Sequence, residues 1–466
     1  MKKLPQHVHV IGISGVATSA LAVAFHNAGV KVTGSDKGFF PPASTELEKH
    51  GVPFYAGWHV DKMIVDGVPD AVIIGTASGS ANPETAYVRE HSIPSYSFAE
   101  AIGEFFARKT SIACVGTWGK SSSAALLSHI FIEAGKNPSY MFGGISLSHK
   151  ASAALIDSDI SIFEGDEYKS SPTDLTAKFF YYKVTDLLMT AVSWDHADLY
   201  PTEDSFLATF KKLTDSLPKN GSIVACSDNP GVEKILFGYN GKVTSYGARS
   251  DSDYFYSNVN QTKDGLRFTI SHKSESWNIT SPMLGLYQAE NITGCFARAH
   301  SLGLDPDVII KSISTFKGMK RRMEKRYEGD ITVIDDIAHS AEKATSVLHT
   351  LRSLYKGTIY CVFEPNIGGR RKEIVHKYDG AFEDADIVII PRLTKLKISD
   401  DEDNRPIDGP ELASIVGKSH KNVHYIEEDK ELVKFLIDNA KKGDVIAFLG
   451  SHGFRGMIEE TIGKTS

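Results

Sequence analysis

The sequence predicts an α/β protein in which parallel sheets are distributed over three domains. Apolar, β-prone runs alternate with helical patterns along most of the chain, as they do when helices cover a parallel sheet. A glycine-rich turn at residues 116–119 separates one of these runs from a helix. The chain has 466 residues, which at about 150 residues per domain predicts three domains. We place them at residues 1–108, 109–317 and 318–466.

The first domain opens with a strand–helix–strand unit. Residues 8–11 and 30–34 are apolar strands, and residues 17–28 have the pattern of a helix. Asp36 follows about 20 positions after the first glycines, as in Rossmann-like dinucleotide sites. Ser14 replaces the second glycine of that fingerprint, so a nucleotide other than NAD is the favoured ligand. A further strand at 71–74 and a helix at 98–108 complete a Rossmann-like N-terminal domain.

The second domain begins with a phosphate-binding loop. An apolar strand at residues 111–115 leads into Gly116-Thr117-Trp118-Gly119-Lys120-Ser121, and we expect a helix over residues 123–134. Backbone N–H groups of such a loop cradle phosphates, and we expect Lys120 to reach the β- and γ-phosphates and the Ser121 hydroxyl to bind Mg²⁺. Cys114 stands where the full pattern has glycine. An ordinary glycine-rich turn is the alternative, but the strand before it and the helix after it favour a P-loop.

Acidic side chains and a histidine follow two other strands of this domain. Residues 160–163 lead into Glu164, Asp166 and Glu167, and residues 187–192 lead into Asp195 and His196. Carboxylates at strand ends beside a phosphate loop are placed to hold Mg²⁺. Solvated acidic loops are the alternative interpretation. The pattern from 254 to 280 is β-like and a helix follows it, so the central P-loop domain should contain a mixed sheet.

A third α/β pattern follows a basic turn at residues 316–322, which contains Arg321 and Arg322. In an acidic chain this turn is the best local binding site for phosphate or carboxylate. A solvated linker or a charge cluster at a helix C-terminus is the alternative interpretation. Strands are expected at residues 331–334, 358–363, 386–390 and 445–449. The first of them ends in Asp335-Asp336-Ile337-Ala338-His339, and the last ends in Gly450-Ser451-His452-Gly453. We expect a second Rossmann-like domain here.

The composition excludes several classes of protein. The net charge of −7 gives no general attraction to nucleic acid or to an anionic membrane. No apolar run reaches the roughly 18 residues that span a bilayer, and the first apolar stretch alternates like a strand rather than a signal peptide. Four widely spaced cysteines fit reduced thiols and a cytoplasmic protein. We therefore expect neither a nucleic-acid nor a membrane partner, and the oligomeric state stays open.

Together these motifs resemble the Mur ligase family, the ATP-dependent amide-forming enzymes of peptidoglycan synthesis. The resemblance covers nearly the whole chain and rests on motifs in all three domains. These motifs are the loop Gly116–Ser121, the acidic segment Glu164–Glu167, Asp195-His196, Lys320-Arg321-Arg322 and Asp335–His339.

The resemblance implies that ATP transfers its γ-phosphoryl group to the carboxylate of UDP-N-acetylmuramate, and that an amine attacks the acyl phosphate. It implies catalytic roles for Lys120, Glu164, His196, Arg321 and Arg322, and Mg²⁺ binding by Ser121, Glu164 and His196. The implied ATP-binding residues are Gly116, Thr117, Gly119, Lys120, Ser121, Ser122, Asn291, Asp336 and His339. The implied residues for the UDP-sugar are Gly15, Ser35, Asp36 and Thr76.

Three stretches resemble the branch of the family that attaches the recycled tripeptide L-alanyl-γ-D-glutamyl-meso-diaminopimelate. They are residues 34–48, Glu167-Tyr168 and residues 450–456. The tripeptide is therefore the expected acceptor, and L-alanine is the alternative. The chain also departs from the family at Ala191, Tyr287-Gln288 and Asn366, where Asn, His-Asn and Arg are usual. These departures leave open a catalytically weakened nucleotide-sugar-binding protein, whereas a nicotinamide oxidoreductase would leave Lys120 unexplained.

Overall fold

The computed structural model describes residues 3–41, 43–75, 81–171, 173–196, 199–394 and 405–465. The chain separates into two compact units. Unit 1 comprises residues 1–260, 267–282 and 287–317, and unit 2 comprises residues 261–266, 283–286 and 318–466. None of the described helices is both long and apolar enough to cross a bilayer.

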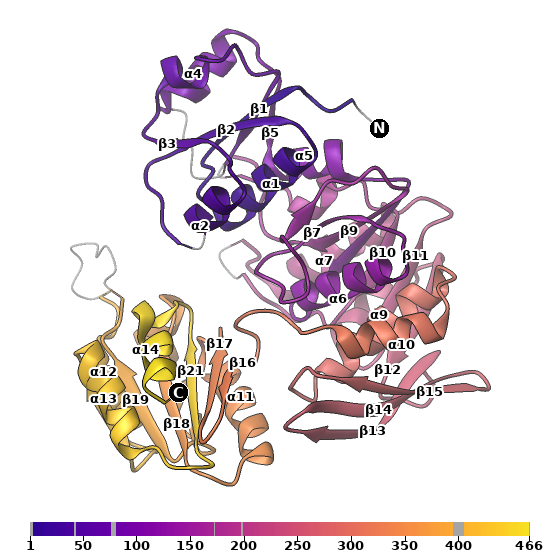
Figure 1. Ribbon diagram of the computed structural model, residues 1–466. Helices are drawn as coiled ribbons and strands as arrows, with labels where there is room; N and C mark the ends of the chain where they lie inside the picture. Colours follow the sequence, from indigo (N-terminus) through magenta and orange to yellow (C-terminus); the bar gives the residue numbers. More distant parts are fainter. Residues whose placement is uncertain are drawn as a thin grey trace. The chain divides into compact units, whose positions relative to one another are not determined.

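Unit 1 begins with a five-stranded sheet in the order β3-β2-β1-β4-β5, and its strands are all parallel (Figure 1). Leu21, Phe25 and Phe106 pack against the sheet with no exposed surface. The strands are β1 (His7–Ile11), β2 (Lys31–Asp36), β3 (Phe54–Ala56), β4 (Ala71–Ile74) and β5 (Ser95–Ser97). The helices are α1 (Val16–Asn27), α2 (Ala43–Lys49), α3 (Val60–Met63), α4 (Pro83–Glu90) and α5 (Phe98–Ala101), which continues as a π-helix over Ile102–Phe106.

The second sheet, which belongs to unit 1 except for the ends of β13 and β14 within residues 261–266, has ten described strands in the order β15-β14-β13-β12-β11-β10-β6-β9-β7-β8. Its centre is parallel, whereas the β7–β8 pair is antiparallel. The strands are β6 (Thr110–Val115), β7 (Ser139–Met141), β8 (Ala153–Ala154), β9 (Ile160–Gly165), β10 (Asp186–Met189), β11 (Ser222–Cys226), β12 (Lys242–Gly247), β13 (Tyr254–Thr262), β14 (Gly265–His272) and β15 (Glu275–Ser281). The helices are α6 (Lys120–Glu133), α7 (Glu203–Asp215), α8 (Pro230–Leu236), α9 (Gln288–Ser301) and α10 (Pro306–Thr315).

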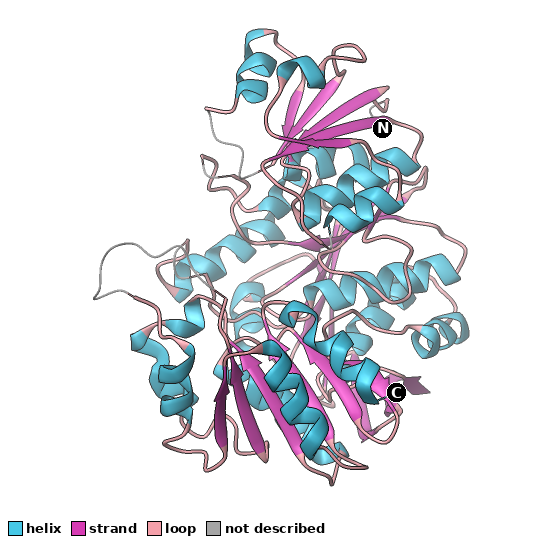
Figure 2. Cartoon of the chain, turned by 60° about the vertical axis from the view of Figure 1, so that its left-hand side comes forward, coloured by secondary structure: helices cyan, strands magenta, loops and turns pink. Residues whose placement is uncertain are grey.

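Unit 2 contains a six-stranded sheet in the order β16-β17-β21-β18-β19-β20, parallel except for β16. Helices lie on both of its faces, over two separate apolar clusters (Figure 2). The strands are β16 (Glu324–Glu328), β17 (Thr332–Asp336), β18 (Ile359–Glu364), β19 (Ile387–Pro391), β20 (Val423–Ile426) and β21 (Val445–Gly450). The helices are α11 (Ala341–Leu354), α12 (Gly409–Val416), α13 (Asp429–Asn439) and α14 (Met457–Thr465).

The predicted fold class is confirmed, with parallel sheets near both ends of the chain and a mixed sheet in the middle. The expected start of the helix after the phosphate loop was wrong by three residues, because α6 begins at Lys120 and not at residue 123. The short strands β3, β5, β7 and β8 carry too few residues for a clear period, and the sequence did not predict them.

Candidate active site

The phosphate loop joins β6 to α6 at the carboxyl edge of the second sheet. Gly116 and Gly119 have φ values of 139° and 82°, a backbone region that L side chains rarely adopt. A Cβ atom on Gly119 would also lie 2.4 Å from Oδ1 of Asn291. Because α6 begins at Lys120, the first N–H groups of the helix open onto the loop. This arrangement provides donors and a positive helix end for an anion.

Lys120 points back across the loop to the acidic segment after β9. Its Nζ donates to the carbonyl of Gly116 at 2.6 Å and to Oε1 of Glu167 at 2.9 Å. The second oxygen, Oε2 of Glu167, also lies 2.9 Å away. The Glu167 side chain is almost fully buried. The predicted phosphate-binding lysine is therefore paired with a carboxylate.

Glu164 makes a separate contact with the phosphate loop. The Ser121 hydroxyl donates to Oε1 of Glu164 at 2.6 Å, and the N–H of Gly143 donates to Oε2 at 2.5 Å. Burial raises the pKa of the Glu164 carboxyl, and these two hydrogen bonds only partly oppose that shift. A hydroxyl and a carboxylate oxygen side by side are ligands that Mg²⁺ accepts.

His196 lies on the loop after β10 and faces Glu167. Its Nε2 is 3.4 Å from Oε1 of Glu167, and this contact raises the pKa of the imidazole despite partial burial. The predicted metal set therefore forms two pairs here. Ser121 contacts Glu164, and His196 contacts Glu167. The two pairs are linked through the loop, because Lys120 precedes Ser121 and also binds Glu167.

The first turn of α9 closes another side of the loop. Gln288 is buried, and its Oε1 accepts a hydrogen bond from Nδ2 of Asn291 at 3.3 Å. This contact orients the Asn291 amide, whose Oδ1 lies against Gly119. Tyr287 is exposed. Gln288, which stands where the family usually has asparagine, thus holds Asn291 in place. Ala191 keeps a backbone role, because its carbonyl accepts from the N–H of Thr117 at 2.8 Å.

The predicted UDP-sugar residues lie at the carboxyl edge of the first sheet. Gly15 is the N-cap of α1. Oδ2 of Asp36 accepts from both the N–H and the hydroxyl of Ser14, so this carboxylate holds the turn. Ser35 is fully buried and donates to Oε2 of Glu84 at 2.5 Å. The Ser35 side chain therefore has no surface for a ligand in this structure, and Thr76 lies outside the described residues.

The predicted residues of unit 2 have contrasting environments. The Arg321 guanidinium bonds Oδ1 of Asp335 at 3.2 Å and the carbonyls of residues 450, 451 and 452. Arg322 is exposed. Asp336 is buried and accepts from the N–H groups of residues 323 and 338, and burial raises its pKa. Burial lowers the pKa of His339, and its Nδ1 lies 2.7 Å from the carbonyl of Ile337. Arg321 thus joins the end of β17 to residues 450–452 within unit 2. The exposed Arg322 side chain is accessible to a ligand.

Sequence reasoning missed two residues that shape the phosphate loop. Gly143 supplies the N–H that fixes Glu164, and no local pattern marks it. Thr190, directly after β10, donates to the carbonyl of Trp118 at 2.6 Å. Thr190 is β-branched and follows apolar residues, so the sequence indicates only a buried strand at this position. The neighbouring Ala191, where the family usually has asparagine, does not mark Thr190 as functional. Both contacts join segments that are distant in sequence.

A Gly-Lys-Ser phosphate loop with carboxylates at a neighbouring strand end defines the class of this protein, an enzyme that uses a nucleoside triphosphate. Three family models match the chain. The Mur ligase family catalytic domain matches residues 7–110, the Mur ligase middle domain matches residues 115–299, and the Mur ligase glutamate ligase domain matches residues 321–452. The chain therefore belongs to the Mur ligase family and is an ATP-dependent, amide-bond-forming ligase.

The chain is similar over nearly its full length to individual family members. It is 30% identical to a UDP-N-acetylmuramate–L-alanine ligase of Brachyspira hyodysenteriae, over 96% of each chain. Among solved structures, the fold matches a UDP-N-acetylmuramate–alanine ligase of Thermotoga maritima with a TM-score of 0.79 at 19% identity, over 98% of this chain and 99% of that one. A murein peptide ligase of Psychrobacter arcticus matches with a TM-score of 0.69 at 22% identity, over 98% of each chain. The two structures support the fold alone.

Proposed function

We propose that this ligase joins the carboxylate of UDP-N-acetylmuramate to the amine of L-alanine. The observation that carries the proposal is the full-length similarity to a relative named for this reaction. The paired contacts of Lys120 with Glu167 and of Ser121 with Glu164 support it, because they place a cation and metal ligands at a phosphate loop. L-Alanine therefore replaces the tripeptide as the first choice of acceptor, because the relative is named as an L-alanine ligase.

In this proposal the loop Gly116–Ser122 and Asn291 hold ATP, and Asp336 and His339 contact the nucleotide. Ser121, Glu164 and His196 would hold Mg²⁺. The hydroxyl and carboxylate oxygens of Ser121 and Glu164 fit the ion, whereas the His196 imidazole is a less usual donor for it. Bound Mg²⁺ would neutralise phosphate charge. The carboxyl edge of the first sheet takes the UDP group, with the N-terminus of α1 at Gly15 facing the diphosphate. Asp36 and Ser35 position that edge through Ser14 and Glu84.

The chemistry needs a leaving group, because a carboxylate is a poor electrophile. A carboxylate oxygen of the sugar attacks the γ-phosphorus, the bond to ADP breaks, and an acyl phosphate forms. The amine then attacks the acyl carbon, inorganic phosphate leaves, and the amine loses a proton. Lys120 and the exposed Arg322 offset the negative charge that develops. Arg321 acts indirectly, because its guanidinium positions residues 450–452 through hydrogen bonds to their carbonyls.

A charge cluster in unit 2 favours the tripeptide as a second candidate acceptor. Arg455 binds Asp429 at 2.9 and 2.8 Å and approaches Oε2 of Glu364 at 3.4 Å. Glu364 is buried at the end of β18. An acceptor that carries several carboxylates and an ammonium group would match these alternating charges better than L-alanine does.

The residue at which peptide ligases usually have arginine works differently here. Oδ1 of Asn366 accepts from the N–H of Gly369 at 2.8 Å, so Asn366 stabilises a turn. Arg370 is buried and donates to the carbonyls of Ile407 and Thr394. Arg371 is exposed and is the better substitute for binding an acceptor carboxylate.

The four buried, unpaired cysteines support the further proposal that the protein works in a reducing compartment, the cytoplasm.

An acceptor screen monitored by phosphate release tests these proposals. The protein is incubated with ATP, Mg²⁺ and UDP-N-acetylmuramate, and L-alanine or the tripeptide is added in parallel. We expect faster release with L-alanine. A preference for the tripeptide would overturn the first choice, and release with neither acceptor above the rate without acceptor would overturn both. Tight UDP-sugar binding without turnover would identify the weakened homologue instead.

A further inference from the structure

Three metal-ligating side chains meet beside the phosphate loop, outside the site described above. Cys226 ends β11, Asp228 follows two residues later, and Glu290 lies in the first turn of α9. The Cys226 sulfur and one carboxylate oxygen each of Asp228 and Glu290 lie within 4.8 Å of one another. Segments more than 60 residues apart in the sequence thus bring a thiol and two carboxyl groups together.

One atom of this cluster is buried without a partner. Oδ2 of Asp228 accepts from the N–H of Ala248 at 2.5 Å, whereas Oδ1 has almost no accessible surface and no hydrogen-bond partner among the described residues. A buried carboxylate oxygen without a donor is costly unless a cation completes it. Cys226 is fully buried, and burial raises the pKa of both its thiol and the Glu290 carboxyl.

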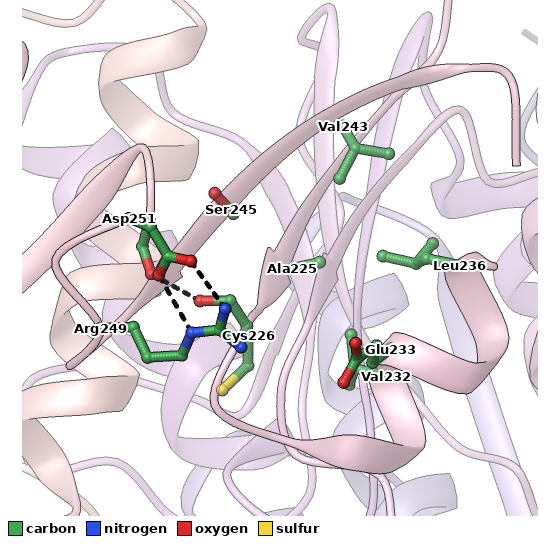
Figure 3. A pocket seen from close by; sticks show the side chains of 11 residues that line it. Ala225, Cys226, Val232, Glu233, Leu236, Val243, Ser245, Arg249 and Asp251 are labelled. Atoms are coloured by element: carbon green, nitrogen blue, oxygen red, sulfur yellow. Dashed lines mark hydrogen bonds and ion pairs between the residues drawn. The ribbon is translucent and has the colours of Figure 1, made fainter.

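The surrounding cations are engaged elsewhere. Within the described ranges, no lysine, arginine or histidine forms an ion pair with Asp228 or Glu290. Asp251 raises the pKa of the Arg249 guanidinium, and Asp228 adds a smaller contribution in the same direction. The guanidinium binds Asp251 at 3.0 and 2.7 Å, beside the cavity of about 290 Å³ that Cys226 also lines (Figure 3). In the part of the chain that the structure describes, the cluster therefore has acidic ligands and no paired cation.

We propose that Cys226, Asp228 and Glu290 form a binding site for a borderline divalent transition metal of the zinc class. A thiolate with two carboxylates suits Zn²⁺ or Co²⁺, whereas Mg²⁺ prefers oxygen ligands alone. The three ligands leave one position of a tetrahedral ion open. Asp228 and Glu290 are partly exposed, so that an ion can enter from solvent on their side. Binding displaces the thiol proton to solvent.

The site is coupled to the phosphate loop through one turn of helix. Glu290 precedes Asn291, whose Oδ1 lies against Gly119. A metal held by Glu290 therefore fixes the turn that carries Asn291. We expect Zn²⁺ to raise the melting temperature of the protein and to change the KM for ATP more than kcat.

Cobalt spectroscopy tests the proposal on the full-length protein. The protein is treated with a chelator, exchanged into buffer without chelator and titrated with Co²⁺. We expect an absorption band from thiolate-to-cobalt charge transfer that saturates at one ion per chain and disappears when Zn²⁺ is added. Excess Mg²⁺ should leave the band unchanged. The proposed magnesium ligands contain no sulfur, so Co²⁺ bound there cannot give this band.

Variants decide which residues bind the ion. C226S should abolish the band, and E290Q and D228N should each weaken Co²⁺ binding at least tenfold. Because Cys226 is fully buried, E290Q and D228N carry the test if C226S does not fold. E233Q, an acidic residue that lines the adjoining cavity, is the matched control and should bind Co²⁺ normally. No charge-transfer band in the unmodified protein, or an unchanged band in both E290Q and D228N, would overturn the proposal.

Discussion

The ammonium of Lys120 lies 2.9 Å from each carboxylate oxygen of Glu167. Lys120 is only 14% exposed and Glu167 is 1% exposed, so solvent screens this ion pair weakly. The same carboxylate also faces His196 at 3.4 Å. Glu167 therefore joins the lysine of the phosphate loop to the loop after β10, and a bound triphosphate would compete with it for Lys120.

The first prediction concerns this ion pair. Replacing Glu167 with Gln leaves the Lys120 ammonium partly buried without its counter-charge, and we expect the free energy of unfolding to fall by about 3 kcal/mol. Urea denaturation measures this change. An ATP analogue with Mg²⁺ should restore part of the loss, because phosphates replace the missing charge.

A double-mutant cycle provides the control for that measurement. K120M combined with E167Q removes both charges, and we expect it to be more stable than E167Q alone. If the stability loss of the double mutant equals the sum of the losses of K120M and E167Q, the pair contributes no interaction energy, and the prediction is wrong. D204N, on the surface of α7, should leave the stability within about 0.5 kcal/mol of the unmodified protein.

The second prediction concerns catalysis by Lys120. K120A removes the cation that we place on the transferring phosphoryl group, and we expect kcat/KM for ATP to fall by about 100-fold or more. Phosphate release in the presence of UDP-N-acetylmuramate and the better acceptor measures it. K234A removes an exposed lysine on α8 and should leave the rate unchanged. Full activity of K120A would show that the lysine of the phosphate loop is not needed for the reaction, contrary to the proposed function.

The sequence predicted what local patterns encode. The order of strands and helices, the phosphate loop and the acidic strand end at Glu164 follow from periodicity and residue spacing. The sequence could not predict which partner each side chain selects. The pairing of His196 with Glu167 and the N–H of Gly143 on Glu164 depend on contacts between distant segments.

Ser35 illustrates the same limit in the first domain. The family resemblance implies that Ser35 binds the UDP-sugar, yet its hydroxyl is buried against Glu84, 49 residues away. The family resemblance likewise implies a catalytic role for Arg321. The sequence could not predict that its guanidinium binds Asp335 and carbonyls about 130 residues later.

The third prediction separates Arg321 from Arg322. R321A removes charge-assisted hydrogen bonds to three carbonyls, and we expect the free energy of unfolding to fall by about 2 kcal/mol or more. R322A removes an exposed side chain, so its stability should stay within about 0.5 kcal/mol while its kcat falls about tenfold or more. Urea denaturation and phosphate release on both variants measure these effects. A stable R321A protein beside an unstable R322A protein would reverse the assignment.

The fourth prediction is a loss of stability in acid that arises from His149. Burial, together with His129, lowers the pKa of His149 to about 4, and the rings of Tyr140 and Phe142 lie 5.1 Å from its ring. Between this pKa and the unfolded value of about 6.5 the unfolded chain binds more protons, so the free energy of unfolding falls as the pH falls. The slope from one such group is at most about 1.4 kcal/mol per pH unit. Urea denaturation at pH 6.5 and 4.5 should therefore show a smaller loss for H149N, which keeps a donor near Ser146, than for the unmodified protein. H376Q, at an exposed histidine, is the control, and equal losses in H149N and H376Q would contradict the prediction.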